Sequence, residues 1–404
     1  MLFFLAGLIE TVGFSHYLNY NFRLLQEFGL NAAEVRQWVG ILGSLTFLLG
    51  LPLAPFWGTW ADRYSRKLII TRSALIEAAF FTMIALSHSL PQLLASASLA
   101  GFVLGNTGVM FAVMSEVAPK NRVGLSLALT GAASPLGFAV GPLMGGLLIN
   151  GITLGHFSFT GISLRSLLML DGTLSLLAGL ALIALFHEPP HLRVESGESI
   201  LHQVWSAISA VLRSPILGTL FSVAVMGYMG QRLMTSYLPL FVAKMHTGPG
   251  LERVIGLIAG TSSAALGLLA PVWGAAGDRV GHARLFPVSV AGASVAFVAL
   301  SLTHTLGQLA VVWVILGALQ AGINPLFYTM VASHTPESQR STVLAFAYVP
   351  LYLGGIIGPA IGAELARLNL PVQSCALVAA LVLAAATVAA ARSGIRRSRA
   401  PMSG

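Results

Sequence analysis

Long apolar stretches alternate with short polar breaks along the whole chain. A membrane-spanning helix needs about 20 mainly apolar residues, and stretches of roughly that length occur twelve times. Before a polar middle section they cover residues 1–24, 38–57, 68–88, 92–114, 123–149 and 165–187. After it they cover residues 215–242, 253–273, 285–305, 308–332, 341–364 and 372–391. The pattern predicts an all-α membrane protein with twelve transmembrane helices, six in each half.

The polar middle section marks a domain boundary. Residues 188–214 combine prolines and glycine with several charged side chains, which is typical of a linker, and residues 201–212 are predicted to form a short surface helix. The expected parts of the chain are an N-terminal six-helix bundle (1–187), a cytoplasmic linker (188–214), a C-terminal six-helix bundle (215–391) and a basic cytoplasmic tail (392–404).

Several short sequence features of the first half recur in the second half, each about the same number of residues later. The charged stretch Gly58–Lys67, predicted to be a loop between the second and third spans, has a counterpart that begins at Gly274. The recurring landmarks are Asp62 with Asp278 (216 positions apart), Gly141-Pro142 with Gly358-Pro359 (217), Pro119 with Pro336 (217) and Asn106 with Asn324 (218). Such repetition indicates a duplicated chain whose two halves are pseudo-symmetric.

The charged stretch reads Gly-Thr-Trp-Ala-Asp-Arg-Tyr-Ser-Arg-Lys. With its second copy and the twelve spans, it resembles the signature of the major facilitator superfamily of secondary transporters. The resemblance implies two six-helix bundles that work by alternating access, with the two stretches latching the halves together on the cytoplasmic side. The alternative is that the two charged stretches only stop the transfer of the chain through the membrane during insertion and so fix its topology. The residues of this gating motif are Gly58, Asp62, Arg63, Arg66, Lys67, Gly274, Asp278 and Arg279.

The fifth span carries closely spaced glycines. They resemble the antiporter motif that this superfamily's proton-coupled drug exporters have, although Ala128 stands where the first glycine of that motif is expected. The fourth span also lacks the arginine that is common in those exporters. A helix-packing face is the alternative, since glycines four residues apart let helices approach closely. The motif residues are Gly137, Gly141, Pro142, Gly145 and Gly146.

Composition and charge support a membrane location. Apolar residues make up 56% of the chain and charged residues only 9%, against about 25% charged in soluble domains. The formal charge of +8 does not indicate nucleic-acid binding, because the bases lie at the ends of apolar stretches. If the Asp62 stretch is cytoplasmic, fifteen lysines and arginines lie on that side and seven on the other. The positive-inside rule then predicts an inner (plasma) membrane protein with both termini in the cytoplasm.

Several kinds of chemistry find no support in the sequence. Cys375 is the single cysteine, so no disulfide within the chain is available. The histidines are scattered rather than set at metal-binding spacing, and neither a phosphate-binding loop nor a nucleophile elbow is present. We therefore expect no enzyme activity, no cofactor, no metal and no drive by ATP.

Ionisable residues inside membrane spans are costly and point to function. The proton-coupling candidates are Glu10 in the first span, Asp171 in the sixth and Arg232 in the seventh. Glu10 and Arg232 rank first because the resemblance places their helices beside the cavity, where they are predicted to form a breakable ion pair. The alternatives are that Glu10 reaches water at the cytoplasmic end and that Arg232 extends to the outer surface.

Polar and aromatic side chains near these charges are expected to line the substrate cavity. Aligning Tyr17-Leu18 with Tyr237-Leu238 places Glu10 opposite Gly230. Asn106 and Asn324 occupy matching positions in the two halves. Their side-chain amides are equally expected to bind substrate or to form hydrogen bonds between helices. The cavity candidates are Tyr17, Asn21, Asn106, Tyr228, Thr235, Gln320, Asn324 and Phe327.

These features predict a monomeric secondary transporter that exports small amphipathic or lipophilic compounds in exchange for protons. The nearest alternative is an importer or facilitator of a sugar, organic acid or other small metabolite, in which Arg232 binds a substrate anion. A membrane receptor or scaffold without transport, and a membrane-embedded enzyme, are the weaker alternatives.

Overall fold

The structure is a computed structural model, and it describes residues 1–119, 122–154, 157–188, 200–337, 343–344 and 346–392. The described chain forms two compact units. Unit 1 contains residues 1–197 and 246–260, and unit 2 contains residues 198–245 and 261–404. Residues 189–199 of the expected linker and nearly all of the expected basic tail lie outside the described residues.

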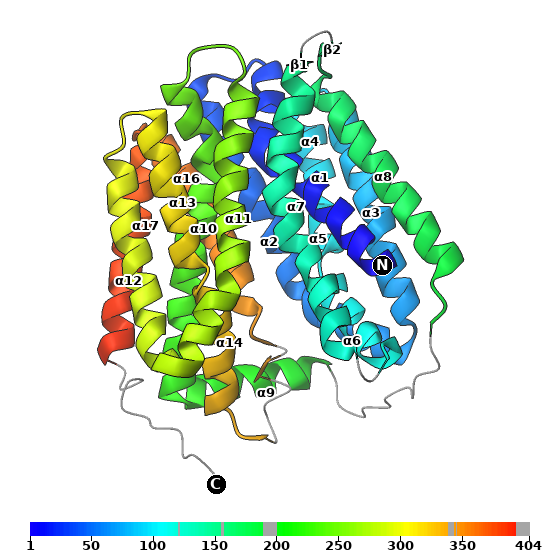
Figure 1. The fold of residues 1–404 in the computed structure, drawn as a ribbon, viewed down its shortest axis with the longest axis vertical. Helices are drawn as coiled ribbons and strands as arrows, with labels where there is room; N and C mark the ends of the chain where they lie inside the picture. Colours follow the sequence, from blue (N-terminus) through cyan, green and yellow to red (C-terminus); the bar gives the residue numbers. More distant parts are fainter. Residues whose placement is uncertain (120–121, 155–156, 189–199, 338–342, 345, 393–404) are drawn as a thin grey trace. The chain divides into compact units, whose positions relative to one another are not determined.

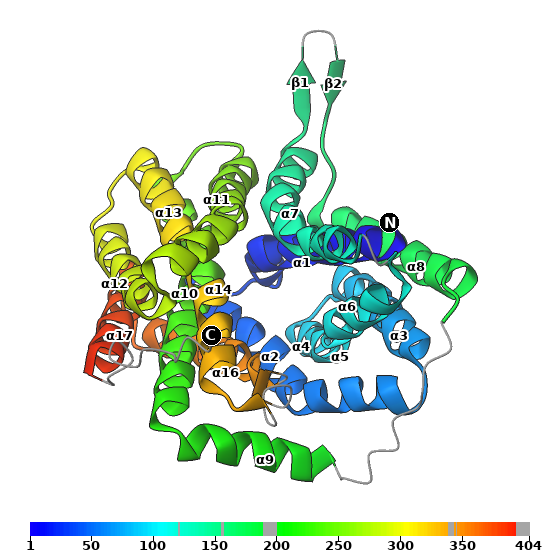
Figure 2. The same ribbon diagram turned by 60° about the horizontal axis from the view of Figure 1, so that its bottom comes forward.

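Unit 1 is built from the helices of the first half (Figure 1). They are α1 (Leu2–Glu27), α2 (Ala32–Arg63), α3 (Arg66–Leu86), α4 (Leu90–Ser98), α5 (Ala100–Val103), α6 (Asn106–Val117), α7 (Val123–Asn150) and α8 (Leu164–Leu185). A short antiparallel hairpin, β1 (Ile152–Leu154) with β2 (Phe157–Phe159), joins α7 to α8 and extends beyond the end of α7 (Figure 2). The first ten residues of α11 (Leu251–Val280) also belong to this unit.

Unit 2 repeats this plan. Its helices are α9 (Ile200–Arg213), α10 (Pro215–Met245), the remainder of α11, α12 (His282–Ser301), α13 (Leu306–Gln320), α14 (Ile323–His334), α16 (Val349–Arg367) and α17 (Gln373–Arg392). Helix α9 confirms the predicted short helix in the linker.

The helices match the predicted spans. Among the described residues, nine helices, counting each broken helix once, are long and apolar enough to cross a membrane. Helices α1, α2 and α10, of 26, 32 and 31 residues, occupy the positions of the other three predicted spans. Helix α1 is unusual because it buries polar side chains, namely Thr11, Ser15, His16, Asn19 and Asn21. The predicted all-α membrane fold is confirmed.

The prediction of a loop over Gly58–Lys67 is wrong. Helix α2 continues through this stretch to Arg63, and α3 starts at Arg66, so only Tyr64 and Ser65 form the turn. The chain changes direction where the Ser65 hydroxyl caps α3 by accepting a hydrogen bond from the Leu68 backbone amide, at 3.1 Å. In the second copy, α11 likewise continues past Asp278 and ends at Val280.

Two predicted spans are interrupted rather than continuous. The span over 92–114 breaks at Leu104 and Gly105, where Gly105 has φ 100° in the left-handed region that favours glycine. The span over 308–332 breaks at the corresponding level, between α13 and α14. An asparagine stands at or next to the start of the helix that follows each break: Asn106 in α6 and Asn324 in α14.

Candidate transport site

Glu10 lies at the first helix break. The Asn106 side-chain amide donates a 2.8 Å hydrogen bond to the Glu10 carboxylate, which joins α1 to the start of α6. Glu10 itself is partly buried, whereas Asn106 is buried at 3% exposure. The break at Gly105 positions this amide, because a continuous helix would place the Asn106 side chain elsewhere.

A cation and a second acid accompany Glu10. The Arg72 guanidinium on α3 lies 3.5 Å from the ring centroid of Trp57 on α2 and attracts the Glu10 carboxylate. Glu77, further along α3, is buried at 2% exposure and is repelled by the negative charge of Glu10. Glu77 also lies within a predicted span, where a contact with a neighbouring helix or a loop base is favoured over a role in transport.

Unit 2 contains the counterpart of this contact. The Tyr228 hydroxyl on α10 donates a hydrogen bond to the side-chain oxygen of Asn324. Both contacts join residues 96 positions apart in sequence. The equivalent of Glu10 is therefore Tyr228, 218 positions later, and the predicted alignment with Gly230 is wrong by two residues. That alignment relied on a Tyr-Leu pair rather than on the cross-helix contact that both units retain.

The glycine motif of α7 packs directly against α1. A Cβ atom at Gly137 would collide with Thr11, one at Gly141 with Ser15, and one at Gly145 would lie 2.6 Å from a ring carbon of His16. The packing interpretation of these glycines is therefore supported by their geometry. Gly146 faces the other way, against the backbone of Glu252 and Arg253 at the start of α11.

His16 and Asp171 form a buried pair within unit 1. The Nδ1 atom of His16 lies 2.9 and 3.1 Å from the two carboxylate oxygens of Asp171 on α8, and its Nε2 atom lies 3.0 Å from the Gly141 carbonyl oxygen. The exposures are 2% for His16 and 4% for Asp171. The sequence analysis singled out Asp171 but missed His16, although a histidine inside an apolar stretch six residues after Glu10 was a usable signal.

The charged stretch between α2 and α3 binds acids of its own unit. Arg66 Nη1 lies 2.6 Å from a carboxylate oxygen of Glu116, at the end of α6. The Ser65 hydroxyl and the Arg66 backbone amide bind Glu188, at 2.6 and 2.7 Å. These contacts tie the start of α3 to the end of α6 and to the segment that follows α8. The side chain of Asp62 lies outside the described residues, and latching of the halves stays a prediction.

Lys67 and the second copy of the stretch make simpler contacts. The Lys67 ammonium donates to the Ile183 carbonyl at 2.6 Å. Asp278, near the end of α11, lies 3.4 Å from the ring of His282, the first residue of α12.

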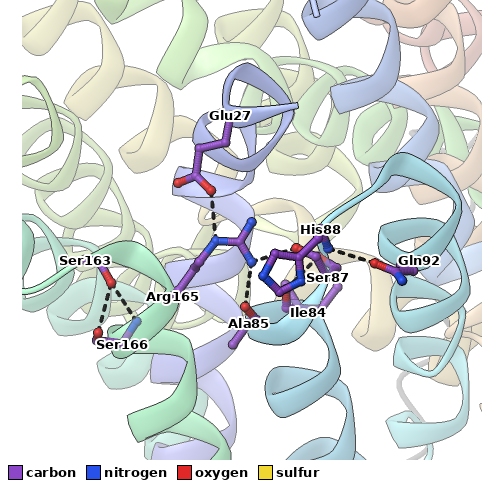
Figure 3. A network of polar contacts seen from close by, with 9 residues as sticks. All are labelled: Glu27, Ile84, Ala85, Ser87, His88, Gln92, Ser163, Arg165 and Ser166. Atoms are coloured by element: carbon purple, nitrogen blue, oxygen red, sulfur yellow. Dashed lines mark hydrogen bonds and ion pairs between the residues drawn. The ribbon is translucent and has the colours of Figure 1, made fainter. Parts of the chain in front are cut away.

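At the opposite end of α1, two arginines hold acids. Arg165 on α8 binds Glu27 at 2.9 Å and donates to the carbonyls of Ala85 and Ser87 (Figure 3). Arg23 forms an ion pair with Glu252, whose carboxylate also accepts a 3.1 Å hydrogen bond from Asn150. Helices α1, α3, α7, α8 and the start of α11 are therefore connected at this end of unit 1.

The remaining candidates lie in varied surroundings. Tyr17 is buried at 1% exposure against Phe80 of α3, and Asn21 is also buried, so both belong to the interior of unit 1. Phe327 packs on Phe221 inside unit 2. The Thr235 hydroxyl donates to its own helix backbone, at Gln231. A substrate role for these residues, and for Gln320 and Arg232, stays a prediction, as does the Glu10–Arg232 ion pair.

The sequence model described as the Major Facilitator Superfamily matches residues 2–252 and again residues 250–402, which together span nearly the whole chain. The chain belongs to the major facilitator superfamily. The double match agrees with the repeated helix plan of the two units, and the predicted family is confirmed.

Relatives of known sequence cover most of the chain. An uncharacterized MFS-type transporter of Bacillus subtilis, YuxJ, is 25% identical over 331 residues, which are 81% of each chain. The multidrug resistance protein MdtG of Citrobacter koseri is 25% identical over 334 residues, which are 82% of this chain and 79% of the relative. The chain is therefore a multi-pass membrane protein of a transporter family.

Solved structures share the fold. A bacterial homologue of the human lysosomal transporter Spinster, in an inward-facing and occupied conformation, matches with a TM-score of 0.79 at 18% identity and covers 99% of this chain and 97% of its own. A point mutant of the nucleoside transporter NupG matches with a TM-score of 0.75 at 13% identity, covering 97% of this chain and 100% of its own. At these identities the likeness concerns the fold alone.

Proposed function

We propose that this chain is a secondary transporter that exports small amphipathic or lipophilic compounds in exchange for protons, by alternating access in the inner membrane. The observation that carries the proposal is the partly buried carboxylate of Glu10, held by Asn106 at a helix break and accompanied by Arg72. The multidrug resistance relatives support the choice of cargo.

Glu10 has the properties that a proton carrier needs. A carboxylate in a dry site is stabilised by a donor and a cation, and it gains a proton when that stabilisation is withdrawn. Glu10 contacts a donor across a helix break, where a small change in backbone conformation alters the hydrogen bond to Asn106.

A vesicle experiment tests this function. The purified protein is reconstituted, a pH gradient is imposed, and lumenal pH is followed while lipophilic cations, neutral drugs, sugars and organic acids are added in turn. Proton movement opposite to cargo is expected for the lipophilic compounds. Glu10→Gln, which keeps the hydrogen-bond acceptor but removes the charge, should reduce proton-driven efflux to the level of empty vesicles. Unchanged efflux would remove Glu10 from the mechanism.

The alternative is an importer or facilitator of a small anionic metabolite. It is favoured by Arg232, a cation within the span α10 whose charge acts on Tyr228 one helix turn away. Under this alternative, organic acids raise the thermal unfolding temperature and Arg232→Ala abolishes the effect, because a ligand that binds only the folded state stabilises it. Cargo flux without proton movement in the vesicles would select this alternative.

A further inference from the structure

The His16–Asp171 pair is built to hold one proton. The Gly141 carbonyl can only accept a hydrogen bond, so the His16 Nε2 atom beside it, at 3.0 Å, carries a hydrogen and donates. Nδ1 then faces the Asp171 carboxylate at 2.9 and 3.1 Å. A neutral ring of this tautomer would turn a lone pair towards a carboxylate, so a proton must lie between the two groups.

Two forms of the pair satisfy this geometry. In one, the imidazole is protonated at both nitrogens and Asp171 is ionised. In the other, the ring is neutral and Asp171 carries the proton. Both forms hold the same single proton. Removing it leaves two hydrogen-bond acceptors, one on each residue, facing each other. Both residues are more than nine-tenths buried. An unpaired buried charge of this kind is costly, so this geometry favours the form of the pair that keeps the proton.

Other ionisable groups reach this pair from the helices packed around it. From α3, Glu77 is a buried acid whose carboxyl group is repelled by the negative charges of Glu10 and Asp171. From α1, Glu10 is the nearest other acid in sequence, and α7 contributes the Gly141 carbonyl. Arg72 on α3 attracts Glu10, whereas Arg165 on α8 is bound to Glu27 at the end of the bundle.

Glu77 has an open position for a proton. Among the described residues, its Oε1 atom is buried and has no hydrogen-bond partner. Glu77 is therefore a further buried acid of the same unit.

We propose that His16 and Asp171 form a second proton-binding site inside unit 1, separate from Glu10. The single proton is held between the Nδ1 atom of His16 and the Asp171 carboxylate, and it leaves the pair as one proton when that contact opens. As a part of transport, this inference rests on the proposed function; as a proton site, it stands on geometry alone.

Infrared spectroscopy of the full chain in lipid nanodiscs tests the site without any cargo. Spectra are recorded as pH is changed, with the wild type compared with Asp171→Asn, His16→Gln and the double variant. Since the pair shares one proton, each single variant should lose the same titrating signal, and the double variant should lose no more. Glu364→Gln and His304→Gln, which change an exposed acid and an exposed histidine, serve as matched controls and should leave that signal in place.

The outcomes separate this inference from the function. Independent signals for His16 and Asp171, or no signal lost in either variant, would overturn the shared site. Asp171→Glu should restore the signal, which shows that an acid and not merely a packed side chain is needed. In vesicles, Asp171→Asn should lose proton-driven flux while keeping cargo-for-cargo exchange, and loss of both would assign the pair a structural role only. Absence of proton movement with the wild type would instead overturn the proposed function.

Discussion

At the scale of single residues, the two repeats keep the same amide and change what it binds. Asn106 donates to an ionisable carboxylate, whereas Asn324 accepts from a phenol. A hydrogen bond to a charged group contributes roughly twice as much as a neutral one. The first unit has therefore retained titratable chemistry at a position where the second unit has a contact between neutral groups.

Asn106→Ala should lower the free energy of unfolding by about 1–3 kcal/mol, because it leaves a carboxylate oxygen within the bundle without its donor. The measurement is thermal or denaturant unfolding in detergent. Ser115→Ala on the same helix is the matched control, since the Ser115 hydroxyl is exposed and bonds only its own backbone. Equal effects of the two substitutions would contradict a specific Glu10–Asn106 contact.

At the scale of helices, the contact between α1 and α7 decides what the unit can hold. The glycines of α7 bring its backbone close enough for the Gly141 carbonyl to accept from His16 and for the Pro142 carbonyl to accept from Tyr20, at 2.5 Å. A motif that sequence reasoning associated with antiport therefore acts locally as a surface on which the polar face of α1 packs. Thr11, His16 and Tyr20 hydrogen-bond to backbone carbonyls of α7 there rather than facing lipid.

Gly141→Ala should destabilise the protein by about 1–3 kcal/mol, since the added methyl group collides with Ser15 and forces the helices apart. Gly124→Ala is the matched control on the same helix, because a Cβ atom there has nothing within 4 Å. It should be neutral or stabilising by up to about 1 kcal/mol. The measurement compares the unfolding midpoints of the two variants with that of the wild type. A Gly141→Ala protein as stable as the wild type would contradict the close contact between α1 and α7.

At the scale of the whole molecule, the two units share one plan but divide the chemistry. Each has a break in its fourth span and an asparagine that bonds to its first helix. Glu10, His16, Glu77 and Asp171 all lie in unit 1. Duplication thus explains the shared helix arrangement of the two units, and the acids of unit 1 distinguish it from unit 2.

The predicted topology is testable with the single cysteine. The wild type should resist a membrane-impermeant maleimide, because Cys375 is only 2% exposed. Gly248→Cys, at an exposed position predicted to face outward, should react in intact cells. His187→Cys, exposed and predicted to face the cytoplasm, should react only after permeabilisation. The reverse pattern would invert the predicted orientation.

The sequence by itself determined the membrane class, the positions of the spans, the duplication and the family, because apolar length and repeated motifs are local properties of the chain. It also selected Glu10, Asp171 and the two asparagines as candidates. Only the tertiary structure decided their partners: the pairing of His16 with Asp171, the hydrogen bond of Asn106 to Glu10, and the equivalence of Glu10 with Tyr228. The two unit 1 contacts join residues 96 and 155 positions apart in sequence, and such separations carry no signal until helix breaks and glycine contacts set which side chains meet.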